Sequence, residues 1–254
     1  MKIKMSNVAQ RSVGIVGFGA FGKLIAQNLY GHFDLKAYDP RSDQRDVAAE
    51  LGVTFTSLQA VARCDVIVIA APVSSFEDVL TSIATVCHPG TLVIDVGSVK
   101  VHPSDLMEKY LPDYVDIVAT HPLFGPQSAC DGIEGLKIAV CPIRGLQHWP
   151  LAAFFRKHLG LQVIMTTPHD HDREAATVQG LTHLIAKVLH RMGPMPSRMT
   201  TRSFDLLVEA VSMVQNDAPE VFDAIENANP YSAGIRRKFF DLAHELGVEL
   251  ENNA

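Results

Sequence analysis

The sequence predicts an α/β protein, with a doubly wound parallel sheet followed by a smaller all-helical domain. From Ser12 to about Met165, short apolar runs alternate with longer amphipathic ones, which is the pattern of βαβ units. After Pro168 the strand-like runs stop, and apolar residues recur at helical spacing instead. We therefore predict one domain over residues 1–167 and a second over residues 168–254.

The predicted strands are short and apolar, and most contain Val or Ile, as strands buried on both faces of a sheet do. In chain order they are Ser12–Val16, Leu35–Tyr38, Val53–Phe55, Val66–Ala70, Leu92–Asp95, Ile117–Thr120, Lys137–Cys141 and Gln162–Met165.

In the second half, apolar residues from Val178 to Met192 lie on one face of a long predicted helix, which Gly193-Pro194 interrupts. Further helices are predicted over Thr200–Val214 and Asp217–Glu226. A last helix follows Pro230 and runs to about Leu246. We expect His171-Asp172 to form the N-terminal cap of the long helix.

Composition points to a cytoplasmic protein that acts on a small molecule. The 254 residues include 22 Lys and Arg against 28 Asp and Glu, a net charge of −6 that offers no attraction to nucleic acid or to a membrane surface. No apolar stretch approaches the roughly 18 residues of a membrane span. The cysteines show no C-x-x-C spacing, so we expect reduced thiols at Cys64, Cys87, Cys130 and Cys141.

A glycine-rich loop follows the first predicted strand. Gly17, Gly19 and Gly22 have G-x-G-x-x-G spacing at the start of an amphipathic helix. The glycines permit a tight turn, close approach of a pyrophosphate and close packing of helix and strand. This context predicts a Rossmann-type dinucleotide-binding domain. The expected contacts come from Gly17, Phe18, Gly19, Ala20, Phe21 and Gly22.

The second predicted strand ends at Asp39, 17 residues after Gly22, close to the roughly 20 expected for a carboxylate that binds ribose hydroxyls. A carboxylate there favours NAD, because it would repel the 2′-phosphate of NADP. Arg41 and Ser42 could instead hold that phosphate, so NADP stays open. An exposed loop position is the alternative for Arg41.

Two further strand-end loops carry polar residues. The strand Leu92–Asp95 leads to Ser98, and the strand Ile117–Thr120 leads to His121. Ligands of open α/β sheets bind at the carboxyl ends of the strands. A histidine there can accept a hydroxyl proton while hydride leaves the same carbon, because its unperturbed pKa of about 6.5 lies near neutral pH. The pattern indicates a dehydrogenase.

Several motifs resemble the prephenate and arogenate dehydrogenases of tyrosine biosynthesis, above all the plant-type arogenate branch. They are GFGAFG, the turn Ala71-Pro72-Val73, DVGSVKVHP, THPLFGPQSA, HDREAATVQGLTHLIAKVL and Asn229-Pro230, and they cover nearly the whole chain. The resemblance implies a Rossmann domain followed by a helical dimerisation domain, and hence a homodimer. It also implies cofactor contacts from Ala71, Pro72 and Val73.

The resemblance further implies roles for individual residues. His121 matches the catalytic histidine, and Ser98 matches the serine that hydrogen-bonds to the reacting hydroxyl. His183 matches a substrate-side histidine, with a buried structural histidine as the alternative. His183 and His171 are 12 residues apart, too far for one helical turn, so we expect no metal pair. Substrate contacts are also expected from Gln127, Ser128, Asp217 and Arg202.

Three of these expectations have alternatives. Arg202 matches the family's carboxylate-binding arginine only loosely, and an exposed helix start is its other interpretation. Lys100, Arg236 and Arg237 are the other candidate cations for the substrate carboxylates. Asp217 could simply open its helix as an acidic first-turn residue.

The resulting functional prediction is NAD(P)-dependent oxidative decarboxylation of arogenate or prephenate. A β-hydroxyacid-type dehydrogenase is one alternative, but that class has a lysine followed by paired asparagines, whereas Lys187 precedes Val188-Leu189-His190. A non-catalytic dinucleotide sensor is another, and it would need a basic recognition face that the sequence does not show.

Overall fold

The computed structural model describes residues 11–215 and 217–253, and its contacts divide the chain into two units. The sheet unit holds the described residues up to Gly97 together with Asp105–Met165. The helical unit holds Ser98–Ser104 and the described residues from Thr166 onward. Residues 98–104 therefore belong to the helical unit, although they follow a strand of the sheet. The predicted division at residues 167/168 assigns this segment to the first domain instead.

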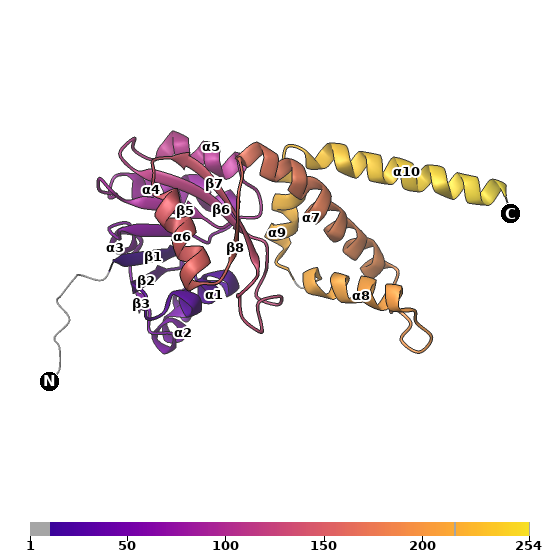
Figure 1. The fold of residues 1–254 in the computed structure, drawn as a ribbon, viewed down its shortest axis with the longest axis horizontal. Coiled ribbons are helices and arrows are strands. Elements are labelled where there is room, and N and C mark those ends of the chain that lie inside the picture. Colours follow the sequence, from indigo (N-terminus) through magenta and orange to yellow (C-terminus); the bar gives the residue numbers. More distant parts are fainter. Residues whose placement is uncertain (1–10, 216, 254) are drawn as a thin grey trace. The chain divides into compact units, whose positions relative to one another are not determined.

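The sheet unit is built on one eight-stranded sheet in the order β3-β2-β1-β4-β5-β6-β7-β8 (Figure 1). The strand order confirms the predicted doubly wound sheet. The strands are β1 (Ser12–Val16), β2 (Asp34–Tyr38), β3 (Thr54–Phe55), β4 (Val66–Ile69), β5 (Leu92–Asp95), β6 (Asp116–Pro122), β7 (Lys137–Arg144) and β8 (Gln162–Met165).

The sheet is mostly parallel, as predicted, with one antiparallel pair of strands near an edge. β7 pairs with β6 in the antiparallel direction, and β8 then runs parallel to β7. Parallel neighbours need a crossover connection, usually a helix, but residues 123–136 between β6 and β7 contain no helix, so the chain returns antiparallel. This pairing also lengthens β6, so that His121 lies inside the strand opposite Ala139 and not in the loop after it.

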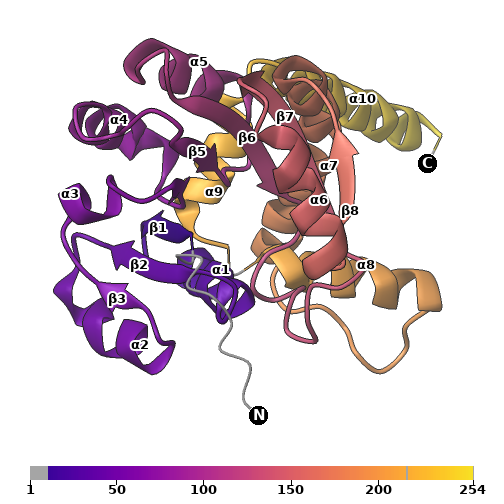
Figure 2. The ribbon, with the colours of Figure 1, turned by 60° about the vertical axis from the view of Figure 1, so that its left-hand side comes forward.

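Helices cover both faces of the sheet (Figure 2). Ile67, Val93 and Ile117 pack on one face beneath α3, α4 and α5, whereas Val13, Leu92 and Ile94 face α1, α2 and α6 on the other. Alternate residues of each strand are thus buried on opposite faces, which is why the strands read as continuous apolar runs. The helices are α1 (Ala20–Leu29), α2 (Arg45–Glu50), α3 (Leu58–Val61), α4 (Phe76–Ala84), α5 (Val101–Tyr110) and α6 (His148–His158).

The helical unit consists of α7 (Pro168–Arg191), α8 (Arg202–Val214), α9 (Pro219–Asp223), a π-helical turn (Ala224–Ala228) and α10 (Ser232–Asn252). α7 packs against α8, α10 and the π-helical turn. The predicted helix Asp217–Glu226 is therefore a short α-helix that passes into a π-helical turn, and the last helix continues six residues beyond the predicted Leu246.

The expectation that His171-Asp172 caps α7 is wrong. Thr167 is the N-cap residue, and its side chain accepts a hydrogen bond from the backbone N–H of Asp170. Pro168 occupies the first turn, where its missing N–H costs nothing. His171 and Asp172 lie one turn further along and are buried.

Candidate active site

The glycine loop has the geometry of a pyrophosphate cradle. Gly17 has a φ of +93°, and a Cβ there would collide with the backbone of Ala70 at the end of β4. A Cβ on Gly22 would collide with the carbonyl oxygen of Gly17. At Gly19 the nearest atom to a Cβ would be the Arg41 Nη2 atom at 3.9 Å, so the backbone there is open to a ligand. α1 begins at the next residue, with its first N–H groups available to phosphate oxygens.

Asp39 is held beside this loop by three hydrogen bonds. Its Oδ2 atom accepts from the N–H of Phe18 at 2.8 Å, and its Oδ1 atom accepts from the N–H and the Nε–H of Arg41 at 2.9 and 3.1 Å. Burial raises the pKa of Asp39, but the hydrogen bonds from Arg41 and Phe18 outweigh it and hold that pKa below its usual value. The carboxylate thus stays charged at the loop, and these residues fit a dinucleotide.

The Arg41 guanidinium bonds to that carboxylate, yet 60% of the Arg41 side chain is exposed. Ser42 is also exposed and opens the 3-10 turn Ser42–Gln44. The structure therefore places the carboxylate that favours NAD and the cation that could hold a 2′-phosphate in one ion pair. On the other side of the loop, Ala71-Pro72-Val73 follows β4 at the same edge of the sheet.

The two catalytic candidates lie at the carboxyl ends of neighbouring strands, His121 within the last residues of β6 and Ser98 in the segment after β5. In the sheet unit, Asp95 at the end of β5 pairs with Ala119 of β6, and the Thr120 hydroxyl donates to the Asp95 carbonyl oxygen at 2.6 Å. His121 comes next and is only 4% exposed. Ser98 lies three residues after the end of β5 and is half-buried. Both chain segments thus leave the carboxyl edge of the sheet, as the sequence predicts.

The predicted contacts after β6 lie on an exposed turn. Gln127 and Ser128 are exposed, and the Ser128 hydroxyl accepts from the N–H of Gly125 at 3.0 Å. The Ser128 hydroxyl is therefore hydrogen-bonded to the backbone of its own turn.

In the helical unit, His183 of α7 is 6% exposed and pairs with Asp217. Its Nδ1 atom lies 2.9 Å from the carbonyl oxygen of Gln179, which can only accept, so Nδ1 carries a proton. Its Nε2 atom lies 3.2 Å from Oδ2 of Asp217, a carboxylate that is less buried. The structure thus brings together two residues that the sequence proposed separately for substrate binding, 34 positions apart.

The candidate cations differ in how accessible they are. Arg202 is the exposed first residue of α8, and Arg237 is exposed on α10. Lys100 is fully buried. Arg236 pairs with Glu226, a buried carboxylate of the π-helical turn whose Oε1 atom has no hydrogen-bond partner among residues 11–215 and 217–253. Sequence reasoning missed Glu226, because a π-helical turn has no signature in residue spacing.

The residues that the structure describes contain no group of three His, Cys, Asp or Glu side chains that could hold a metal ion. Within residues 11–215 and 217–253, no helix combines the length and apolar character needed to cross a membrane.

Comparisons with known proteins agree with this geometry. A family model described as "Prephenate dehydrogenase, nucleotide-binding domain" matches residues 27–143. The chain is 30% identical to arogenate dehydrogenase 2, chloroplastic, of Arabidopsis thaliana over 243 residues, which cover 92% of this chain and 68% of that protein. It is 33% identical to arogenate dehydrogenase 1, chloroplastic, of the same plant over 252 residues, 94% of this chain but 39% of that longer protein.

Solved structures share the fold. Prephenate dehydrogenase of Aquifex aeolicus, in complex with hydroxyphenyl propionate and NAD+, superposes with a TM-score of 0.74 at 22% identity, over 97% of this chain and 94% of the other. Arogenate dehydrogenase of Synechocystis superposes with a TM-score of 0.66 at 19% identity, over 94% and 93% of the two chains.

Proposed function

Because this chain belongs to the prephenate and arogenate dehydrogenase family, we propose that it catalyses NAD(P)-dependent oxidative decarboxylation of arogenate or prephenate in tyrosine biosynthesis. One observation carries the proposal: buried Asp39 at the glycine loop and buried His121 in β6 belong to the same carboxyl edge of one sheet. That edge is where open α/β sheets bind their ligands.

The protein's own groups account for cofactor binding. The N–H groups at the start of α1 would hold the pyrophosphate, and Asp39 would accept hydrogen bonds from the adenine ribose. Ala71, Pro72 and Val73 line the opposite side of the loop. When bound, the nicotinamide supplies the hydride acceptor.

The protein's part in the chemistry is to move one proton and to hold the ring. Hydride leaves the ring carbon that bears the hydroxyl, and His121 takes the hydroxyl proton while Ser98 orients the oxygen. The bond to the ring carboxylate then breaks, and its electrons enter the ring as carbon dioxide leaves. The oxygen, now phenolic, regains a proton from His121. Aromatisation makes the sequence favourable, so one poised base and good positioning suffice.

For the cofactor we propose a modest preference for NAD over NADP. The Asp39 carboxylate stays charged at the ribose position, because its hydrogen bonds keep its pKa low. Arg41 neutralises part of the Asp39 charge, and its side chain is exposed. It therefore weakens the repulsion between Asp39 and the 2′-phosphate of NADP.

For the substrate we propose arogenate. The Asp217 carboxylate beside His183 would pair with the α-ammonium group of arogenate, whereas the keto group of prephenate would leave that charge unpaired. Gln127, Ser128 and Arg202 are proposed as further contacts.

The partner we propose is a second copy of the chain. Apolar side chains on the helical unit are exposed in the single chain, including Val178, Leu206, Leu207, Phe240, Leu242, Leu246 and Leu250.

The test is a direct assay of purified protein with arogenate or prephenate, each with NAD and with NADP. We expect reduction of the cofactor at 340 nm together with stoichiometric release of carbon dioxide. Reduction without carbon dioxide release would indicate a simple hydroxyacid dehydrogenase. Binding of NAD(P) without turnover of either substrate would overturn the proposal.

A further inference from the structure

We infer that Asp172 is a positioning residue for Ser98. Its carboxylate caps the first turn of α5, a helix that begins 71 residues earlier in the chain, and so fixes the segment that carries the serine. The inference rests on the proposed function, because that function gives Ser98 its role.

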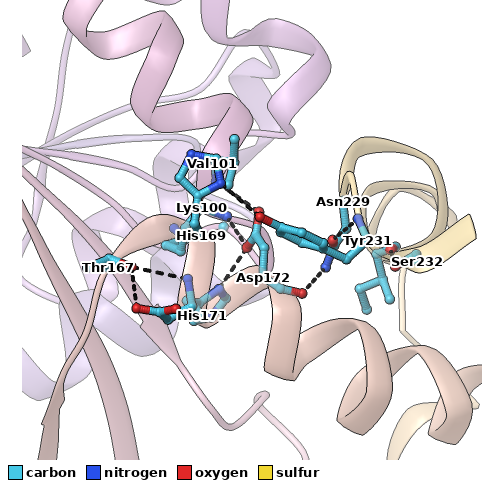
Figure 3. A network of polar contacts seen from close by, with 12 residues as sticks. Lys100, Val101, Thr167, His169, His171, Asp172, Asn229, Tyr231 and Ser232 are labelled. Atoms are coloured by element: carbon cyan, nitrogen blue, oxygen red, sulfur yellow. Dashed lines mark hydrogen bonds and ion pairs between the residues drawn. The ribbon is translucent and has the colours of Figure 1, made fainter. Parts of the chain in front are cut away.

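The cap consists of two hydrogen bonds within the helical unit, one buried and one partly buried. Oδ1 of Asp172 accepts from the N–H of Lys100 at 2.7 Å, and Oδ2 accepts from the N–H of Val101 at 2.9 Å (Figure 3). α5 begins at Val101, so these are among the N–H groups that a helix leaves without partners. A carboxylate is well suited to them, because it accepts charge-assisted bonds and complements the positive end of the helix dipole.

The carboxylate is itself firmly held. Asp172 is 0% exposed, and the Nδ1 atom of His171 lies 2.8 Å from its Oδ1 atom. The side chain of Asn229 donates to the backbone carbonyl of Asp172 at 2.8 Å, and its own oxygen accepts from the N–H of Tyr231. A buried carboxylate would be costly without such partners. The proposed mechanism does not use the motifs His171-Asp172 and Asn229-Pro230. Both motifs contribute hydrogen bonds to Asp172 (Figure 3).

The cap restricts the movement of Ser98. The N–H of Gly97 donates to Oδ2 of Asp95 at 2.9 Å, which ties one side of the segment to the end of β5. Asp172 ties the other side at Lys100 and Val101. Only Ser98 and Val99 lie between these two anchors. Loss of the second anchor would let the serine move, and a misplacement of about 1 Å can cost about 100-fold in rate.

The first test is a double-mutant cycle in kcat with the full chain. Asp172→Asn keeps the shape of the side chain but turns an NH₂ group toward a backbone N–H, so one bond of the cap is lost. We expect a loss of about tenfold to 100-fold in kcat with little change in KM for the cofactor. In the Ser98→Ala background the same substitution should change kcat by less than about twofold, because the group it positions is gone.

The matched control is Asp170→Asn, two residues earlier on α7. Asp170 is exposed and bonds to Thr167 and Arg173, so its loss should leave kcat unchanged. Equal losses from Asp172→Asn in both backgrounds would show that Asp172 acts through general destabilisation, and would overturn the inference.

The second test does not depend on turnover. Hydrogen exchange at the amides of Lys100 and Val101 should speed up at least tenfold in Asp172→Asn, while the amide of Leu184 in the middle of α7 keeps its protection. Unchanged exchange at these amides would show that Asp172 does not cap α5, even if the protein proves to be the proposed enzyme. Inactivity of the wild type on both substrates would refute the proposed function, and hydrogen exchange would still test the cap.

A milder variant covers the case in which Asp172→Asn does not fold. Asn229→Ala removes the bond to the Asp172 carbonyl and the bond from the N–H of Tyr231, but it keeps the Asp172 carboxylate. It should lower kcat less than Asp172→Asn does, with the same dependence on Ser98. An effect that persists in Ser98→Ala would count against the inference.

Discussion

The Nε atom of Arg41 lies 3.1 Å from Oδ1 of Asp39, so the cation and the carboxylate that we propose to select between NAD and NADP are each other's partner. The two side chains form one ion pair of opposite charges. A carboxylate alone would repel that phosphate, and an arginine alone would attract it. The discrimination between the two cofactors should therefore be small and easy to change.

Asp39→Ser should shift the preference toward NADP. The substitution removes the negative charge and releases Arg41 for the phosphate. We expect the ratio of kcat/KM for NADP to that for NAD to rise at least tenfold. Arg41→Ala is the matched variant and should shift the ratio the other way. A wild type that already uses NADP faster than NAD would contradict the proposed preference.

His121→Ala should cut kcat by about 10² to 10⁴, the usual contribution of a positioned acid-base group. The fold and cofactor binding should survive, because the change lies at one end of β6. His158→Ala on α6, where the side chain is exposed, serves as the control and should keep normal turnover. A loss of less than about tenfold would give His121 a structural role.

Asp217→Asn should raise the use of prephenate relative to arogenate, because it removes the charge that would pair with the α-ammonium group. Steady-state kinetics on both substrates measure the ratio. Glu220→Gln, an exposed neutralisation in the first turn of α9, should leave that ratio unchanged. The same ratio in wild type and Asp217→Asn would return Asp217 to a purely structural role beside His183.

The chain should be a homodimer at micromolar concentration, because many large apolar side chains of the helical unit are exposed in the single chain. Light scattering should give twice the 27.7 kDa of one chain. Leu246→Glu on α10, where Leu246 is exposed, should shift the protein toward monomers. A monomeric wild type would refute the dimer.

The cysteines should differ sharply in reactivity. Burial raises the pKa of the Cys87 thiol to about 11, whereas Cys130 is exposed. Iodoacetamide at pH 8 should therefore label Cys130 in the folded protein and Cys87 only after unfolding, as peptide mass mapping can show.

Because the pKa of Cys87 is higher in the folded than in the unfolded protein, its burial should also lower the free energy of unfolding as the pH rises from about 9 to 11. Labelling of Cys87 in the folded chain at pH 8 would contradict both expectations.

Local patterns in the sequence determined the strands, the glycine loop and the position of Asp39. Three predicted strands, Ser12–Val16, Leu92–Asp95 and Gln162–Met165, have the observed bounds. Runs of apolar residues indicate buried strands, and a glycine indicates a positive φ or a close backbone contact at its own position. Both features can be recognised from residues that are adjacent in the sequence. The catalytic candidates could be found for the same reason, since His121 lies near the carboxyl end of β6 and Ser98 lies three residues after β5.

Only the tertiary structure decided which distant residues meet. The reversal of β7 depends on a connection without a helix, and the pairing of His183 with Asp217 joins positions 34 residues apart. Asp172 was expected to cap its own helix, yet it caps α5 instead. The direction of β7 follows from the length and structure of its connection. The physical reason for the other two contacts is that a buried polar group must find a partner, and any segment that the fold brings near can supply one.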